Sequence, residues 1–362
     1  MRSLYIHVPF CDSICAYCDF CRVRKNEVLL KKWLLTLEEE INDRISNSNF
    51  DTVYIGGGTP TCLIEDDLAQ FLNLIKPCLT NSVETTIEIN PETLTIEKAK
   101  IIKLAGINRV SLGIQTIDET LLKLIGRKHT KKDIMQCIKW LHEVGITNIS
   151  CDCMYSLPTQ TMLQLEQTLD FIVAIGVPHC SIYSLTIEEN SEFSRKGYQA
   201  LDEDTEADMY EFIVGYLERN SFQQYEISNF CKNGYESKHN IHYWQYDDFV
   251  GLSIGASGKE EHCRYECTKN FEDYFKHNFV QEIIPLTQED EMFEMIMMGL
   301  RLRWGLDLKQ FEERFNQKFD DVYVDEKTSA INKGWLIEKD NFLMCTDKGY
   351  EICNSVIEEF MK

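Results

Sequence analysis

The sequence predicts an α/β protein built on a partial (β/α)6 barrel of the TIM type, with a β-rich and helical extension and a small winged-helix-like C-terminal segment. Two observations predict the barrel. Short apolar runs alternate with helical patterns six times in about the first 185 residues, and residues of unusual chemistry follow those runs. Strands that alternate with helices form parallel sheets with right-handed crossovers. A doubly wound open sheet is the alternative.

The strands are predicted from apolar runs such as VYIG and VSLGI, which are typical of strands buried on both faces. They cover residues 4–8, 51–55, 85–89, 109–114, 148–154 and 179–185. Apolar residues at helical spacing predict helices over residues 27–45, 65–75, 95–105, 119–125, 131–144 and 162–175. In a parallel barrel, ligands bind at the carboxyl ends of the strands. We therefore expect the functional site there.

The composition limits the class of protein. The 362 residues are 44% hydrophobic, enough for one large domain with appendages. A net charge of −22 argues against nonspecific binding to nucleic acid or anionic lipid. There is no apolar run of membrane-spanning length and no charged-then-apolar leader, so we expect a cytoplasmic protein. In that compartment the fifteen cysteines indicate metal binding, catalysis or core packing rather than disulfides.

Four cysteines follow the first strand within eleven residues: Cys11, Cys15, Cys18 and Cys21. Thiolates this close together can turn toward one centre, and soft sulfur ligands favour Fe–S clusters, zinc or copper. Zinc sites usually combine separated pairs of ligands, whereas Cys11-x3-Cys15-x2-Cys18 is one compact loop. Cys21 is left out of the expected ligand set; it is a spare thiolate, a redox-active thiol or a packing residue.

The ends of the other strands also carry candidate ligand-binding residues. These are the glycine run Gly56–Gly58, Glu88, Gln115 and Asp152. Glycine lets the backbone approach a ligand closely, although a tight turn has the same signature. Glu88 and Asp152 lie in apolar strands, where each either accepts hydrogen bonds from a ligand or forms a structural salt bridge. Arg127 either pairs with a ligand carboxylate or is a solvated cation.

After residue 200 the pattern changes to an acidic helix over residues 201–219, followed by the segment His239-Asn240-x-x-Tyr243-Trp244. A neutral imidazole is a good iron ligand, and aromatic side chains can stack on a flat macrocycle. The alternative is a histidine buried in a polar loop. Residues 249–258 are expected to form a strand and a glycine-rich turn.

The C-terminal segment is predicted to begin with a helix at Thr287, where Asp290 forms an imperfect capping box. Residues 334–337 and 342–345 suggest the hairpin of a winged helix. Residues 287–362 contain 10 Lys and Arg against 17 Asp and Glu, which opposes nucleic-acid binding and favours a lid or docking role. We place the domain boundaries at residues 1–200, 201–285 and 286–362.

Five motifs together resemble the oxygen-independent coproporphyrinogen III oxidase-like family of the radical S-adenosylmethionine (SAM) superfamily. They are Tyr5-x-His7-x-Pro9-Phe10-Cys11, Gly57-Gly58-Thr59-Pro60-Thr61, Glu88-x-Asn90-Pro91, Ser111-x-Gly113-x-Gln115 and Asp152-x-x-Tyr155-x-Leu157-Pro158. The resemblance covers nearly the whole chain, and one departure is Ser156, where the family usually has glycine.

This resemblance implies a radical-SAM barrel in which a [4Fe–4S] cluster and SAM are bound. It implies that Cys11, Cys15 and Cys18 bind the cluster, that Tyr5 packs beside it, and that Gly57 and Glu88 contact the cluster-bound SAM. It also implies a second SAM site, lined by Gly58, Thr59, Gln115, Arg127 and Asp152. Whether one or two SAM molecules bind, and whether SAM is cleaved, stays open.

The His239 to Trp244 segment resembles the signature of the HemW branch of this family, whose members bind heme and pass it on. The resemblance implies a heme chaperone with His239 as axial ligand, an electron donor to the cluster, and heme acceptors that include respiratory enzymes at the membrane. The main alternative is a coproporphyrinogen III oxidase. Three features argue against an oxidase: the nearly terminal position of Cys11, the two residues between Cys18 and Cys21, and the HemW-type signature. An enzyme that acts on heme itself and a plain regulator are further alternatives, so enzyme activity stays open and no catalytic residue is assigned.

Overall fold

The computed structural model describes residues 2–45 and 49–361, and its main feature is a twelve-stranded sheet. Six parallel strands follow one another across it in chain order: β1 (Arg2–Val8), β4 (Thr52–Gly57), β5 (Glu84–Ile89), β6 (Arg109–Gln115), β7 (Asn148–Tyr155) and β8 (His179–Ser184). A doubly wound sheet would reverse this order at a switch point. The chain-order succession therefore confirms the barrel-type α/β fold.

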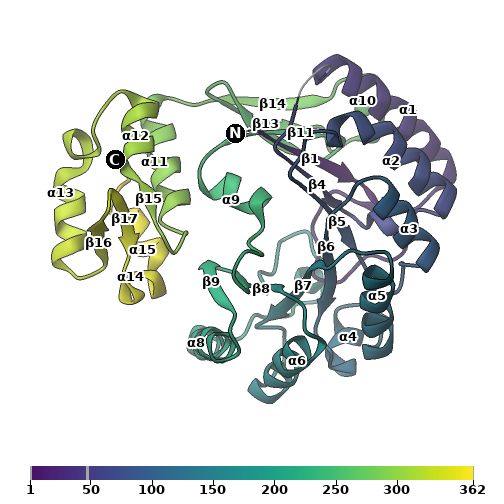
Figure 1. Cartoon of the computed structure of the whole chain (residues 1–362), viewed down its shortest axis with the longest axis horizontal. Helices are drawn as coiled ribbons and strands as arrows, with labels where there is room; N and C mark the ends of the chain where they lie inside the picture. The colour runs from purple at the N-terminus through teal and green to yellow at the C-terminus, as the bar shows by residue number, and fades with distance from the viewer. Residues whose placement is uncertain (1, 46–48, 362) are drawn as a thin grey trace.

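Helices cover the outer face of these strands (Figure 1). They are α1 (Glu27–Arg44), α2 (Glu65–Leu79), α3 (Ile96–Leu104), α4 (Glu119–Leu124), α5 (Lys131–Glu143) and α6 (Met162–Ile175). Side chains alternate between the two faces of a strand. In β1 this places Leu4, Ile6 and Val8 in the apolar core and leaves Ser3, Tyr5 and His7 on the inner face. The inner face of the partial barrel is consequently polar.

The extension adds strands to both edges of the barrel sheet. One edge gains the antiparallel strands β10 (Asn229–Cys231) and β9 (Gln223–Glu226). The other gains β11 (Asp248–Leu252), parallel to β1, and then antiparallel β12 (Ser257–Glu260), β13 (Cys263–Cys267) and β14 (Val280–Pro285). The helices of this region are α7 (Glu192–Arg195), α8 (Glu203–Arg219), α9 (Lys238–Trp244) and α10 (Phe271–Tyr274). Short elements β2 (Phe10–Cys11), β3 (Val23–Arg24) and η1 (Pro60–Cys62) surround the cysteine loop.

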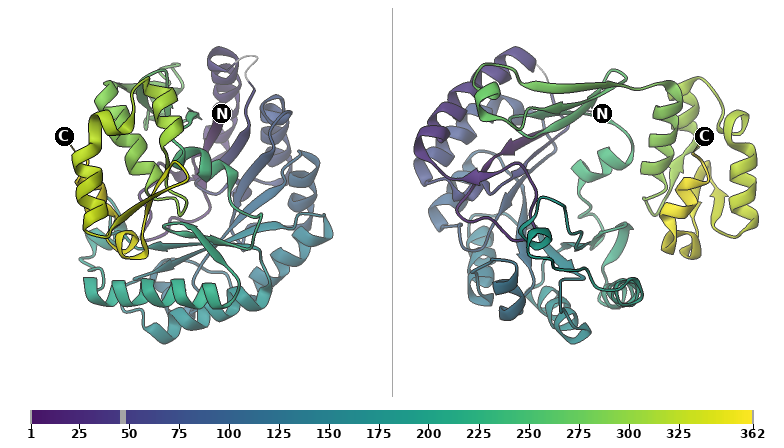
Figure 2. Two further views of the ribbon diagram at one scale, coloured as in Figure 1. Left: turned by 60° about the vertical axis from the view of Figure 1, so that its left-hand side comes forward. Right: turned by 180° about the vertical axis from the view of Figure 1, so that it is seen from behind.

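The C-terminal segment packs around an apolar core of its own and stands apart from the barrel helices (Figure 2). Its helices are α11 (Gln288–Gly299), α12 (Leu308–Phe315), α13 (Phe319–Asn332), α14 (Asp347–Glu351) and α15 (Cys353–Glu358). Its strands are β15 (Leu306–Asp307), β16 (Leu336–Lys339) and β17 (Phe342–Cys345), and β16 and β17 form the predicted hairpin. The capping box of Thr287 and Asp290 is complete. The three domain boundaries stay predictions. In the described part of the chain, no helix is long and apolar enough to cross a membrane.

Candidate functional site

The cysteine loop lies at the carboxyl end of β1 and β4. Thr59 Oγ1 donates to Cys11 Sγ at 3.7 Å, and Arg127 Nη1 lies 4.0 Å from Cys15 Sγ. Burial is the main cause that raises the pKa of Cys11 to about 11, and the charges of Cys18 and Cys15 act in the same direction. Hydrogen-bond donors of Thr59 and Arg127 thus lie beside two of the three sulfurs. Across residues 2–45 and 49–361, no group of three or more His, Cys, Asp or Glu side chains is arranged to hold a metal ion, so Cys11, Cys15 and Cys18 as cluster ligands stay a prediction.

Cys21 is directed away from the other three cysteines. Its Sγ lies 3.9 Å from the carbonyl oxygen of Lys269, and its Cβ lies against Gly255. The Cys21 carbonyl accepts from His7 Nε2 at 2.7 Å, which fixes the end of the loop to the inner face of β1. The packing of Cys21 agrees with its exclusion from the expected ligand set.

The glycine run brings β4 against the cysteine loop. Gly57 has φ = +103°, and a Cβ there would lie 2.5 Å from the His7 ring. A Cβ on Gly58 would lie 2.4 Å from the Phe10 carbonyl oxygen. Both glycines are therefore required by close packing, as the turn interpretation of the sequence expects, and their contact with a ligand stays a prediction. The Gly57 N–H donates to Glu88 Oε2 at 3.2 Å.

Replacing Gly57 by alanine is expected to lower the free energy of unfolding by about 3 kcal/mol or more, through left-handed backbone strain plus a clash with His7. The matched control is Gly106→Ala, because Gly106 has φ = +96° and an added Cβ meets no atom within 4 Å. Urea unfolding at neutral pH measures the free energy of unfolding of both variants. Equal losses in the two variants would contradict the clash.

Glu88 is half-buried between Tyr54 and the glycine turn. Its Oε1 accepts from Tyr54 Oη at 2.9 Å, and Tyr54 stacks on Tyr5 with ring centroids 6.2 Å apart. Burial, and secondly the charge of Asp152, raise the pKa of Glu88 to about 7. Glu88 makes no salt bridge in the described residues, so the salt-bridge alternative does not apply. A buried carboxyl group with a raised pKa and no ion-pair partner favours a cationic ligand such as an ammonium group.

The raised pKa of Glu88 predicts a pH dependence of stability. Because the folded pKa exceeds the unfolded one, the stabilisation is complete below about pH 4.5 and is lost as the pH rises through about 7. The parent protein should therefore lose about 2–3 kcal/mol relative to Glu88→Gln between pH 4.5 and pH 8. Urea titrations of the ligand-free proteins across this range measure the difference. A difference that does not change with pH would show that Glu88 is not perturbed.

A polar network centred on Arg127 connects the third and fourth strands to the cysteines. Arg127 Nη2 donates to Asn90 Oδ1 at 2.9 Å and to the Gly113 carbonyl at 2.6 Å. Asn90 Nδ2 donates to Thr59 Oγ1 at 2.9 Å, and Thr59 donates in turn to Cys11. Arg127 is 6% exposed, so it is not the solvated helix-end cation of the alternative interpretation.

Gln115 is the last residue of β6, and Asp152 lies inside β7. Gln115 has φ = +52°, and its buried Oε1 has no hydrogen-bond partner in the structure. Such an orphaned acceptor is costly unless a ligand donor satisfies it. Asp152 accepts from Ser111 Oγ at 2.7 Å and from Ser150 Oγ at 3.1 Å. The orphaned oxygen and the glycine turn fit a polar ligand at the carboxyl end of the strands.

His239 lies at the opposite end of the strands from the cysteine loop. Its Nδ1 pairs with Thr52 Oγ1 at 2.8 Å, and its Nε2 pairs with Tyr243 Oη at 2.7 Å. Thr52 begins β4 and Gly57 ends it, a separation of about 16 Å along a strand. His239 is 1% exposed, and burial lowers its pKa to about 3. Both ring nitrogens are therefore occupied in this conformation. Tyr54, whose ring centroid lies 5.2 Å from that of His239 and which also stacks on Tyr5, lies between the two ends.

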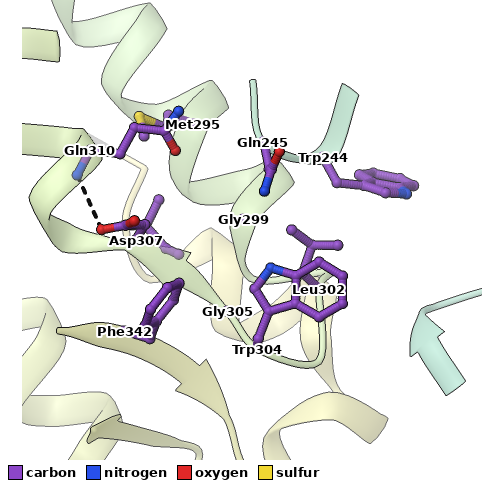
Figure 3. A pocket seen from close by; sticks show the side chains of 11 residues that line it. Trp244, Gln245, Met295, Gly299, Leu302, Trp304, Gly305, Asp307, Gln310 and Phe342 are labelled. Carbon is purple, nitrogen blue, oxygen red and sulfur yellow. Dashed lines mark hydrogen bonds between the residues drawn. The ribbon is translucent and has the colours of Figure 1, made fainter. Parts of the chain in front are cut away.

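Trp244, at the end of α9, enters a small pocket shared with the C-terminal segment. Figure 3 shows some of the residues that line it: Trp244 at the end of α9, Gln245 directly after it, Met295 from α11, Trp304 and Phe342. The pocket volume is about 100 Å³, below the ~300 Å³ at which small-molecule sites begin. A porphyrin does not fit into this pocket as it stands.

Comparison with known proteins identifies the family of the chain. A family model described as the radical SAM superfamily matches residues 5–172, and one described as the HemN C-terminal domain matches residues 286–352. A curated relative from Lactococcus lactis subsp. lactis, Heme chaperone HemW, is 36% identical, with 99% of this chain and 97% of the relative covered. The Bacillus subtilis protein of the same name is 34% identical, with 100% and 99% covered. The chain belongs to the HemW family.

HemW-family membership confirms the resemblance stated from the motifs. The fold is also that of HemN from Escherichia coli, a coproporphyrinogen III oxidase described as a radical SAM enzyme, with a TM-score of 0.87 over 100% of this chain and 90% of that one. At 18% identity this similarity concerns the fold alone. The HemW relatives, which match over their full length, are the comparison that bears on function.

Three residues of the site were not singled out from the sequence as functional. Tyr54 bridges Glu88, Tyr5 and His239, Asn90 connects Arg127 to Thr59, and His7 holds the Cys21 carbonyl. Strand alternation was the available signal. Tyr54 lies two residues before Gly56 and Asn90 two residues after Glu88, which places each on the inner face.

Proposed function

We propose that this protein is a heme chaperone on a radical-SAM scaffold, which binds a [4Fe–4S] cluster, SAM and heme and passes heme to acceptor proteins. The observation that carries the proposal is the full-length similarity to proteins named Heme chaperone HemW. The His239 to Trp244 signature and the Cys11-x3-Cys15-x2-Cys18 spacing support it. We place the protein in the cytoplasm, where an electron donor serves the cluster and acceptors include respiratory enzymes at the membrane.

In this proposal Cys11, Cys15 and Cys18 hold the cluster, with Thr59 and Arg127 donating to two of the sulfurs. Tyr5 packs beside the cluster, and Gly57 and Glu88 contact the SAM molecule bound to it. Gly58, Thr59, Gln115, Arg127 and Asp152 line the second SAM site. When bound, the cluster supplies one-electron chemistry and SAM a reactive sulfonium group. Glu88 supplies the negative charge for an ammonium group, and the orphaned Gln115 Oε1 supplies an acceptor.

His239 is the proposed axial ligand of heme. Its low pKa keeps the imidazole neutral, which is the form that binds iron. Because both of its ring nitrogens are hydrogen-bonded, heme binding through His239 requires α9 to move away from Thr52 or Tyr243 to turn away. The proposal therefore includes a rearrangement of α9 on heme binding.

Anaerobic incubation with coproporphyrinogen III, SAM and a low-potential reductant separates a chaperone from the alternative, a coproporphyrinogen III oxidase. The reconstituted protein is expected to leave the substrate unchanged while it retains added heme through gel filtration. HemN under the same conditions is the positive control. Decarboxylation of the propionate side chains at a rate comparable to that of HemN would overturn the chaperone proposal.

A further inference from the structure

A large groove is lined by residues of α8 and α14. Figure 1 shows α8 on the barrel and α14 in the C-terminal segment. Its volume is about 1700 Å³, above the ~300–1,000 Å³ of ordinary small-molecule sites. One wall is the outer side of α8 with the edge strand β9, and the other is α14 with Arg303. A space of this size suits a segment of polypeptide.

The groove is strongly acidic. Five carboxylates line it from α8: Glu203, Glu206, Asp208, Glu211 and Glu218. Two more, Asp347 and Glu351, face them from α14. Only two guanidinium groups are present, and that of Arg303 is already bound to Gln224 and to Asp347 at 3.0 Å.

Most of this negative charge has no internal partner. Glu206 accepts from Ser184 and Ser156. Across residues 2–45 and 49–361, no salt bridge involves Glu203, Asp208, Glu211 or Glu218. Helix α8 is held against the barrel by Met209, Ile213 and Leu217, so these acidic side chains are not needed for its packing.

The floor of the groove is apolar. Met162 from α6 and Tyr210, Phe212 and Val214 from α8 line it, and all four are only half-buried. A side chain that is half-buried at the base of a groove can bury further area when a partner covers it. The combination of an apolar floor and an acidic wall matches a segment with one apolar face and one cationic face.

We propose that the groove between α8 and α14 docks a cationic amphipathic segment of a partner protein. Charge argues against the other occupants. A second copy of this chain carries the same net charge of −22, nucleic acid is anionic, and the propionates of a porphyrin would face seven carboxylates. The inference rests on the groove alone and does not depend on the proposed heme function.

The test is a fluorescence-anisotropy titration with a synthetic leucine–lysine peptide patterned as an amphipathic helix. In the full-length protein, Glu211→Lys with Glu218→Lys is expected to weaken binding about tenfold or more. The matched control is Glu38→Lys with Asp43→Lys, an equal change of charge at exposed positions of α1, on which we expect less than about a twofold effect.

If both pairs of substitutions weaken binding equally, the peptide is bound by general charge attraction and the groove assignment is wrong. Absence of binding to the parent protein would also overturn the assignment. A serine–lysine peptide of equal charge is expected to bind about tenfold more weakly than the leucine–lysine peptide, because it cannot cover the apolar floor. Equal affinities of the two peptides would contradict an amphipathic partner. Displacement of the peptide by stoichiometric hemin would assign the groove to the macrocycle instead.

Discussion

Replacing Cys15 by alanine is expected to abolish assembly of the [4Fe–4S] cluster and to leave the fold intact. Cys15 is half-buried, and its thiol has only weak polar contacts, with Arg127 and Tyr17, so its loss should shift the melting temperature of the cluster-free protein by less than about 3 °C. The cluster loses one of three protein ligands and cannot be held. Cys11→Ala and Cys18→Ala should behave in the same way.

Anaerobic reconstitution followed by iron analysis measures the effect. The parent protein should bind about four iron atoms per chain, and each of the three variants close to none. Cys21→Ala is the matched control, because Cys21 belongs to the same loop but packs against Gly255 and the Lys269 carbonyl. Loss of iron in Cys21→Ala, or retention in any of the other three, would disprove the proposed ligand set.

Replacing His239 by alanine is expected to lower the free energy of unfolding by about 3 kcal/mol, whatever its effect on heme. The imidazole is buried against Tyr54 and Tyr243, and its removal leaves a cavity and an unpaired Tyr243 hydroxyl. Urea unfolding at pH 7 checks this value. A loss below about 1 kcal/mol would show that α9 is not held by this side chain.

Because of this structural effect, loss of heme binding in His239→Ala alone would not identify the axial ligand. Tyr243→Phe is the informative partner variant, since it frees His239 Nε2 and keeps the aromatic packing. If His239 binds the iron, heme affinity should rise about fivefold in Tyr243→Phe, which corresponds to one hydrogen bond of about 1 kcal/mol. Unchanged affinity in Tyr243→Phe, together with retained binding in His239→Gln, would contradict axial ligation by His239.

The barrel could be predicted from the sequence because its signals are local. Each of the six strands is a short apolar run, and observed bounds such as Arg109–Gln115 differ from the predicted ones by only a few residues. The cluster of unusual residues at the strand ends was also predictable, because parallel strands place their carboxyl ends together. Arg127 does lie near the cysteine loop, and Glu88 and Asp152 lie on the inner face of the same sheet.

The surroundings of His239 could not be predicted in this way. Its partner Thr52 lies 187 positions earlier in the chain, and neither residue carries a local sign of the contact. Helix α9 is short and rich in aromatic and polar residues, so its helical propensity is weak; it is fixed by the Ser237 cap and by Glu84, which accepts from the His239 N–H. The acidic groove likewise depends on how the C-terminal segment packs beside α8, which no local pattern encodes.

The most direct test of a heme chaperone is an anaerobic hemin titration of the reconstituted protein, followed by absorbance. We expect saturable binding of about one heme per chain, with a Soret band that differs from that of free hemin and that shifts in His239→Gln. Because the pKa of His239 is about 3, this binding should change little between pH 8 and pH 5, where an exposed histidine would be protonated. Absence of saturable hemin binding in the intact, reconstituted protein would contradict the proposed function.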